Sequence, residues 1–267
     1  MITSLSNAKI KHLKELQLKS RTRNKENLFV AEGFKMFLEA PEALIKEVYV
    51  ESNTYEKIKE SDNKAPLNHF KAFEKIEYLK KKGVFVESVS EEVFRKSSDT
   101  ETPQGIIFVM DRLKYDLKDM TNGNMLLIED IQDPGNLGTM IRTAEGASIA
   151  GVVMTKGTVD IYNPKTVRAT MGSLYRVPFI YVENLKEAAD FIKSKGVKIY
   201  AAHLKGEKFY DEVSYDTKSA FLIGNEGNGL SDEASSLADE LIKIPMGGEL
   251  ESLNAAVAAA ILMYSAR

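Results

Sequence analysis

The sequence of 267 residues contains no cysteine and only three histidines. The absence of cysteine excludes disulfides, thiolate zinc sites and cysteine nucleophiles. The histidines are scattered along the chain, so we do not expect a histidine metal site. Together these absences favour chemistry that proceeds without a transition metal.

Long apolar runs are also missing. No run reaches the roughly 18 residues that a membrane-spanning helix needs. The first residues, Met1 to Asn7, lack the charged region and apolar core of a secretory signal. We therefore expect a cytoplasmic protein. Its 43% hydrophobic and 28% charged residues are typical of a globular chain, and its length suggests two domains.

The charge is distributed unevenly. Residues 1–35 hold eight Lys or Arg against three Glu, a net charge of +5. Because the whole chain has a net charge of −3, the remaining residues carry a net charge of −8. Such a basic segment can neutralise the phosphates of a nucleic acid. Taken alone, it is equally compatible with a solvated amphipathic helix.

The first hundred or so residues alternate between strand and helix patterns. Strands are predicted at 28–33, 45–50, 84–89 and 102–109, and helices at 7–18, 34–39, 55–60 and 70–82. We expect a small α/β domain over residues 1–110. The polar stretch 111–124 ends in Asn122-Gly123-Asn124 and is predicted to be a linker.

The second part, residues 125–267, also alternates. Apolar strands are predicted at 125–128, 151–154, 177–180, 197–202, 220–223 and 241–244, with helical segments between them. This pattern predicts a mostly parallel sheet that is covered on both faces. Ligands of such sheets bind outside the carboxyl ends of the strands, so the loops after the strands are the candidates.

Two of these loops are unusual. In 129–144 we expect Asn136 to cap a helix and to place Arg142 on its second turn, so that both face one pocket. An ordinary turn with Arg142 in a surface ion pair is the alternative. Residues 224–231 contain three glycines, which let backbone approach a ligand. This loop lacks the Gly-Lys-Ser/Thr of a phosphate-binding loop and is weak evidence alone.

The C-terminal segment is the third candidate. Gly, Ser and Asn residues in 247–254 precede a helix over 255–267 that has no polar stripe. We expect this helix to be buried on every face. Polar backbone donors at the start of a buried helix can hold a ligand.

The three loops resemble, in their order and spacing, those of the SpoU (TrmH-like) family of RNA ribose 2′-O-methyltransferases, part of the SPOUT superfamily. The resemblance rests on Asn136-Leu137-Gly138 with Arg142, on Ile223-Gly224-Asn225-Glu226-Gly227, on Ile244-Pro245-Met246, and on Glu251-Ser252-Leu253-Asn254. The segment 163–172 is also similar to the family and is predicted to form a helix that Asn163 caps and Pro164 opens. The N-terminal part is similar, more loosely, to the substrate-binding domain of family members that act on ribosomal RNA.

This resemblance implies that residues 125–267 form a methyltransferase domain. Its α/β sheet would carry a trefoil knot, in which the C-terminal segment is threaded through a loop, a rare exception among folds. The knot would hold S-adenosylmethionine, and no metal would be needed. By the resemblance, the cofactor contacts are Gly224, Ile244 and Leu253, with His203, Leu204, Glu226, Gly227, Met246 and Ser252 nearby.

The resemblance also implies roles in catalysis and RNA binding. The mechanism implied by the family makes Arg142 the acceptor of the proton from the ribose hydroxyl. A guanidinium stays protonated in proteins, so we expect instead that Arg142 binds the neighbouring phosphate. Asn136, Ser252 and Asn254 would orient the hydroxyl and the cofactor, and Glu226 would anchor Asn136. The expected RNA contacts are Lys9, Lys11, Arg21, Arg23 and Arg168. Family members are homodimers, so a dimer through the C-terminal domain is expected.

Three alternatives remain at this point. The substrate could be transfer RNA, although the separate N-terminal domain favours ribosomal RNA. The chain could be an inactive RNA-binding member of the same fold, although Asn136, Arg142, Glu226, Ser252 and Asn254 are all present. A nicotinamide-dependent dehydrogenase would need a Gly-x-Gly-x-x-Gly turn after the first strand of a domain, which 133–138 does not supply.

Overall fold

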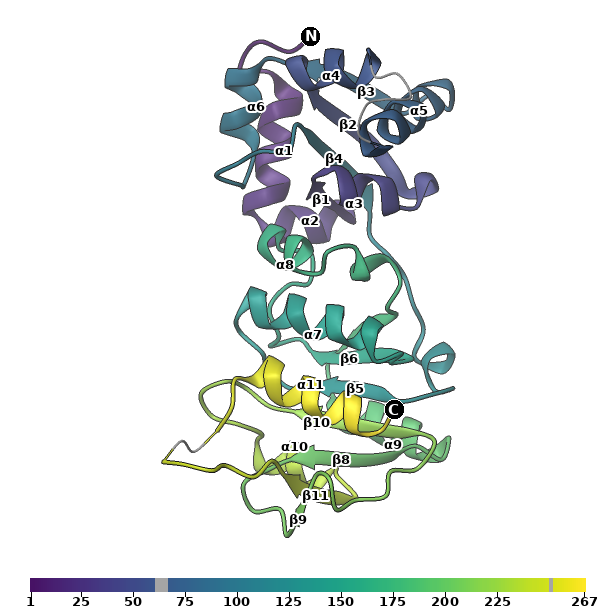
Figure 1. The fold of residues 1–267 in the computed structure, drawn as a ribbon, viewed down its shortest axis with the longest axis vertical. Helices are drawn as coiled ribbons and strands as arrows, with labels where there is room; N and C mark the ends of the chain where they lie inside the picture. Colours follow the sequence, from purple (N-terminus) through teal and green to yellow (C-terminus); the bar gives the residue numbers. More distant parts are fainter. Residues whose placement is uncertain (61–66, 250–251) are drawn as a thin grey trace. The chain divides into compact units, whose positions relative to one another are not determined.

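The computed structural model describes residues 1–60, 67–249 and 252–267. The chain forms two compact units (Figure 1). Unit 1 comprises Met1–Leu113 and Tyr162–Tyr175, and unit 2 comprises Lys114–Ile161 and Arg176–Arg267. The segment 162–175, which the sequence places in the C-terminal domain, therefore packs with the N-terminal one.

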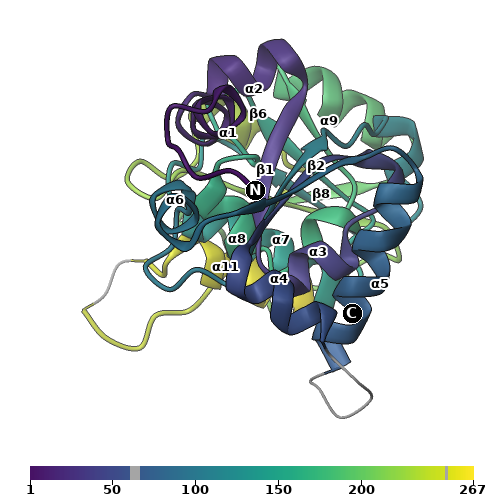
Figure 2. The same ribbon diagram turned by 90° about the horizontal axis from the view of Figure 1, so that it is seen from above.

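Unit 1 is a small α/β layer, as predicted. Its sheet has the order β1 (Leu28–Glu32), β4 (Ile106–Asp111), β2 (Ile45–Glu51), β3 (Phe85–Val89), and only the β2–β3 pair is parallel. Figure 2 shows β1 and β2 between α1 and α6 on one side and α3 and α5 on the other. The helices are α1 (Ala8–Leu18), α2 (Ser20–Glu26), α3 (Phe34–Glu39), α4 (Ser52–Lys59), α5 (Leu67–Lys81), α6 (Glu91–Ser97) and α8 (Pro164–Ala169), with short 3-10 turns η1 (Glu42–Leu44) and η3 (Ser173–Tyr175).

Unit 2 contains the predicted parallel sheet. Its described strands run in the order β7 (Phe179–Val182), β6 (Gly151–Thr155), β5 (Met125–Ile128), β10 (Ser219–Ile223), β8 (Lys198–Ala202), β11 (Glu240–Lys243), β9 (Lys208–Phe209). Every pairing between them is parallel. The chain adds β6 and β7 on one side of β5 and the later strands on the other. The topological switch point, where α/β sheets bind ligands, thus lies between β5 and β10.

Helices cover both faces of this sheet. Figure 1 shows α7 (Pro134–Gly146) and α11 (Ala255–Ser265) side by side on one face, and the two helices are in contact. On the other face, α9 (Leu185–Ser194) and α10 (Asp232–Ser236) pack on alternate strand residues, including Leu127 and Leu222. Strands β5 and β10 are buried along their whole length, which explains why they appear in the sequence as continuous apolar runs.

The C-terminal helix corrects one prediction. Helix α11 buries Ala255, Ala259 and Leu262 among its contacts with α7 and β10. However, Val257 is 48% exposed and Tyr264 is 49% exposed. The prediction of burial on every face is therefore wrong for a single chain, because α11 belongs to an outer layer and has one apolar face without cover.

The stretch 111–124, predicted to be a linker, is structured. It begins with the last residue of β4, and Leu117–Met120 forms the 3-10 turn η2. Met120 is fully buried in the core of unit 2. None of the helices in the described ranges is long and apolar enough to cross a bilayer.

Candidate functional site

Three loops meet at the carboxyl edge of the unit 2 sheet. They are the β5 loop (residues 129–133), the glycine-rich loop (residues 224–231) after β10, and the segment 244–254 that leads into α11. Carboxyl ends of parallel strands share one edge, so the sequence predicted that these loops converge. Hydrogen bonds between residues about a hundred positions apart hold this edge together. Asn225 in the glycine-rich loop donates to Asp130 in the β5 loop, and Asn254 donates to Asn136 in the first turn of the helix that follows the β5 loop.

A cavity of about 330 Å³ opens at this edge, a size within the range of roughly 300–1,000 Å³ that small-molecule sites occupy. All nine residues that the sequence proposes as cofactor contacts lie on its wall. The wall also includes residues that the resemblance did not assign to the cofactor, namely Ala202, Ile223, Asn225, Asn228, Gly229, Leu230, Lys243, Ala255 and Ala258. Asn225, Asn228 and Gly229 belong to the glycine-rich loop, so their position on the cavity wall could have been predicted from that motif.

The glycine-rich loop folds back on itself at the cavity. The backbones of Asn225 and Gly229 exchange two hydrogen bonds of 3.0 Å. A Cβ atom on Gly224 would lie 2.3 Å from the carbonyl carbon of Gly229, so only glycine fits there. Gly229 adopts a φ of +69°, which a residue without a side chain reaches at no steric cost. The loop therefore presents bare backbone to the cavity.

A chain of hydrogen bonds links the three loops beside the cavity. Asn254 Nδ2 donates to Asn136 Oδ1 at 3.0 Å, and Asn136 Nδ2 donates to Glu226 Oε1 at 3.0 Å. The Glu226 carboxylate also accepts from the backbone N–H groups of Gln132 and Asp133. Burial raises the pKa of Glu226, but the hydrogen bonds from Asn136 and this backbone outweigh it and hold that pKa below its ordinary value. Glu226 is thus an ionised anchor.

The start of α7 differs from the prediction. Asp133 is the N-cap, its Oδ1 accepts from Asn136 N at 2.8 Å, and Pro134 opens the helix. The Asp-Pro pair is a recognisable cap signal. The prediction that Asn136 caps the helix is therefore wrong, and its side chain is instead available to Glu226 and Asn254.

Arg142 does not share a cavity wall with Asn136, since neither residue lines the cavity. Arg142 lies six residues further along α7, which turns its side chain about 120° away around the helix. It is exposed, and no hydrogen bond or ion pair joins it to another of the residues the structure describes. A surface ion pair, the alternative for Arg142, is thus not formed within that part of the chain, and its guanidinium is accessible.

His203 and Ser252 offer polar groups to the cavity. The backbone N–H of Lys205 donates to His203 Nδ1 at 3.0 Å. A neutral His203 therefore carries its proton on Nε2 and donates from that nitrogen. Ser252 is exposed, and Leu253 beside it is partly buried. Residues 250 and 251 of this motif lie outside the described residues.

The N-terminal cations divide into two groups. Lys9 forms an ion pair with Glu47. Arg23 is only 3% exposed, and its Nη1 donates to the backbone oxygens of Leu16 and Gln17 at the end of α1. Including Arg23 among accessible RNA contacts was wrong, because the fold uses its guanidinium to satisfy carbonyl groups that α1 leaves open.

The second group is accessible. Lys11, Arg21 and Lys25 are exposed and Lys14 is partly exposed. Within the described ranges, none of these four has an ion pair or a side-chain hydrogen bond. These four cations can meet an external phosphate without breaking such a contact.

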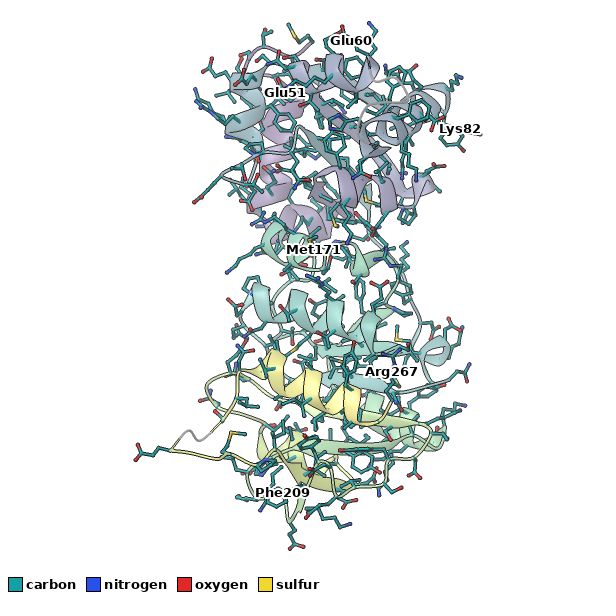
Figure 3. The ribbon with its side chains drawn as sticks, viewed as in Figure 1. Glu51, Glu60, Lys82, Met171, Phe209 and Arg267 are labelled. Carbon is teal, nitrogen blue, oxygen red and sulfur yellow. The ribbon has the colours of Figure 1, made fainter. Side chains whose placement is uncertain are left out.

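Arg168 lies in the segment of unit 1 that follows Tyr162. Its Nη1 pairs with Asp99 Oδ2 at 3.1 Å. Asn163 caps α8 and Pro164 opens it, as predicted. Met171, labelled in Figure 3, is 40% exposed and has a left-handed φ of +51°.

Comparisons with known proteins find matches to both parts of the chain. A family model described as SpoU rRNA Methylase family matches residues 123–264. A second, described as MRM3-like substrate binding domain, matches residues 7–107. The chain is 36% identical over 268 residues to the 23S rRNA (guanosine(2553)-2′-O)-methyltransferase RlmP of Bacillus subtilis, which covers 100% of this chain and 98% of the relative.

Solved structures give the same result over the whole chain. An rRNA methyltransferase from Sinorhizobium meliloti is 28% identical with a TM-score of 0.82. The match covers 100% of this chain and 96% of that one. A structure of an rRNA methyltransferase from the same organism with AdoMet bound has a TM-score of 0.81 at the same identity and coverage.

Proposed function

The chain belongs to the SpoU rRNA methylase family, and we propose that it methylates the ribose 2′-hydroxyl of one guanosine in 23S ribosomal RNA. Its general activity is S-adenosylmethionine-dependent 2′-O-methylation of ribosomal RNA. The observation that carries the choice of nucleotide is the 36% identity along the full length to a relative named for that guanosine. A protein that acts on ribosomal RNA must meet that RNA, so we also propose a cytoplasmic location for this protein.

We assign the cavity to the cofactor. Gly224 and Gly227 supply backbone groups, and Ile244, Met246 and Leu253 supply an apolar wall, a combination suited to an adenosine with a charged tail. His203, Leu204, Glu226 and Ser252 complete the proposed contacts. Bound S-adenosylmethionine would supply an electrophilic methyl group on a positively charged sulfur.

The residues beside the cavity would position the RNA. The Glu226 carboxylate fixes Asn136, and Asn136 together with Ser252 and Asn254 would orient the ribose hydroxyl. Arg142 is accessible and would bind the phosphate next to that ribose. Glu226 is a poor candidate for the proton acceptor, because its hydrogen bonds favour the ionised form and lower its basicity.

Unit 1 would hold the RNA backbone. We retain Lys11 and Arg21 among the predicted contacts, add Lys14 and Lys25, and keep Arg168 as a cation that would exchange Asp99 for phosphate. These contacts would supply affinity that depends on salt, because binding releases counterions from the RNA. Lys9 would contribute only after giving up Glu47.

We further propose a trefoil knot and a homodimer. Helix α11 returns to α7 and β10 after β11 is complete, an arrangement that supports threading of the C-terminal segment. The exposed apolar face of α11, with Val257 and Tyr264, is a surface that a second copy would cover.

The decisive experiment compares RNA from cells with and without this protein. A 2′-O-methyl group protects the adjacent phosphodiester from alkaline cleavage, because that cleavage uses the free hydroxyl. We expect protection at the 23S guanosine that corresponds to guanosine 2553, the nucleotide in the name of the Bacillus subtilis relative. Purified protein with S-adenosylmethionine should restore it in RNA from the deletion strain. Protection in transfer RNA alone would overturn the substrate, and no protection in any RNA would indicate an inactive binding protein.

A further inference from the structure

Both ends of the Asn225 side chain are engaged in the glycine-rich loop. Its Oδ1 accepts from the backbone N–H groups of Gly227 at 2.8 Å and Asn228 at 3.1 Å. Its Nδ2 donates to the backbone oxygen of Asp130 in the β5 loop at 2.8 Å. Two N–H donors on one side and a carbonyl on the other fix the orientation of the amide. One end thus shapes the loop, and the other end ties that loop to its neighbour.

Asp130 is held firmly from the opposite side. It has a left-handed φ of +53°, an uncommon conformation for a residue with a side chain. Its Oδ1 accepts from Thr155 Oγ1 at 2.6 Å, and its backbone N–H donates back to that oxygen at 2.9 Å. Gln132 Nε2 donates to the Asp130 carbonyl at 2.9 Å and to the Gly157 carbonyl at 2.8 Å. These hydrogen bonds therefore fix the position of the Asp130 carbonyl to which Asn225 donates.

We propose that Asn225 is a positioning residue for methyl transfer, one that sets the spacing between the glycine-rich loop and the β5 loop. Glu226 makes a second connection between the same loops, through Gln132 and Asp133, and also binds Asn136 in α7. Two adjacent connections prevent the glycine-rich loop from pivoting, as it would about Glu226 alone. This inference rests on the proposed function, since it takes the first loop to hold the cofactor and the second to lead into the residues that orient the ribose.

The two ends of the amide have separable tasks, which makes the inference testable. Asn225→Asp keeps the oxygen that Gly227 and Asn228 bind but replaces the donor with an oxygen facing the Asp130 carbonyl. Asn225→Ala removes both ends. The first variant should therefore preserve the cofactor wall and lose the spacing, whereas the second should lose both.

Binding of S-adenosylmethionine by calorimetry and methylation of ribosomal RNA from a deletion strain would be measured for each variant. Asn225→Asp should lower kcat about 10- to 100-fold, as misplacement by up to ~1 Å does, with the cofactor Kd within about threefold of wild type. Asn225→Ala should lower kcat and also weaken cofactor binding. A wild-type kcat for Asn225→Asp, or a loss that saturating cofactor restores, would overturn the proposal.

Two further variants separate positioning from folding and charge. Asn122→Asp adds the same charge at an exposed position outside the site and should leave kcat and Kd unchanged. Gln132→Glu removes the other donor to the Asp130 carbonyl. It should lower kcat by less than Asn225→Asp does and leave the cofactor Kd nearly unchanged, so it provides a test even if Asn225→Asp folds poorly. If wild-type protein binds the cofactor but methylates no RNA, the proposed function fails instead, and that result is visible before any variant is tested.

Discussion

Substitution of Gly224 by alanine tests whether the turn of the glycine-rich loop shapes the cofactor cavity. The new Cβ would lie 2.3 Å from the Gly229 carbonyl carbon and 2.4 Å from its oxygen. Real Cβ contacts essentially never fall under 3.0 Å, so the two backbones must separate by at least 3.0 minus 2.3, or 0.7 Å. Because both partners are backbone, no side-chain rotation can absorb this shift, and the hydrogen bonds between Asn225 and Gly229 lengthen.

The energetic effect follows from this displacement. Overpacking of this kind costs about 1–3 kcal/mol. If the loop relaxes away from its position in the free protein, binding must reverse the relaxation. A cost of that size weakens S-adenosylmethionine binding by about 5- to 150-fold, at ~1.4 kcal/mol for each factor of ten.

Calorimetry with S-adenosylmethionine and a thermal melt of the same sample would measure both effects. Gly247→Ala is the matched control, since a Cβ there meets no atom of the described residues within 4 Å. It should leave Kd and Tm unchanged. If Gly224→Ala lowers Tm but leaves Kd at the wild-type value, the turn contributes to folding only, and the reasoning that it shapes the cavity is refuted.

Substitutions elsewhere in the two units have further expected outcomes. The pKa of Glu226 lies below its ordinary value, so its ionised form stabilises the fold above that value, and this contribution is lost as pH falls through the folded-state pKa. Glu226→Gln should lower the free energy of unfolding near pH 7 by about 1 kcal/mol, a small value because the side chain is exposed. In urea melts this difference should shrink at acid pH; a constant difference would contradict it. Arg142→Lys should keep RNA affinity in filter binding but lose most turnover, because lysine lacks the bidentate fork, and near-normal turnover would exclude an essential role. Lys11→Gln with Arg21→Gln should reduce the salt dependence of log Kd by about 0.7–0.9 per lost phosphate contact, and an unchanged slope would exclude them from the interface. Val257→Glu should convert dimers to monomers, as measured by light scattering. A monomeric wild type, or a variant that remains dimeric, would contradict the proposed dimer.

The architecture of unit 2 was predictable because its information is local. Buried parallel strands such as β5 and β10 are apolar throughout, and the segments between them carry helical patterns. The same logic placed the loops at one edge. Asp133 followed by Pro134 was an equally local signal for the start of α7, and assigning the cap to Asn136 overlooked it.

Whether each basic residue is exposed or buried could not be predicted from the residues next to it in the sequence. Lys11 and Arg23 look alike in the sequence, yet one is exposed and the other is buried against the carbonyls of Leu16 and Gln17. The difference arises because α2 turns back on the end of α1, and a buried guanidinium is tolerated where it satisfies several acceptors. The exposed face of α11 escaped prediction for a related reason. Composition shows that a helix is apolar but not which layer it occupies.

The hydrogen-bond chain beside the cavity explains why amides, and not merely polar residues, occupy two of its positions. Asn254 Oδ1 accepts the backbone N–H groups of Ala256 and Val257 at the start of α11, which leaves only its NH₂ group to face Asn136. Asn136 must therefore present Oδ1 to Asn254, and its own NH₂ group then requires an acceptor. The Glu226 carboxylate is that acceptor, and its need for donors is met by the same amide and by the β5 loop. The cap of a helix at one end thus dictates the orientation of each group up to the cavity wall. Residues 118 and 90 positions apart act as one unit. The resemblance to the family implied the contact between Glu226 and Asn136, whereas no local sequence pattern indicated the contact between Asn136 and Asn254.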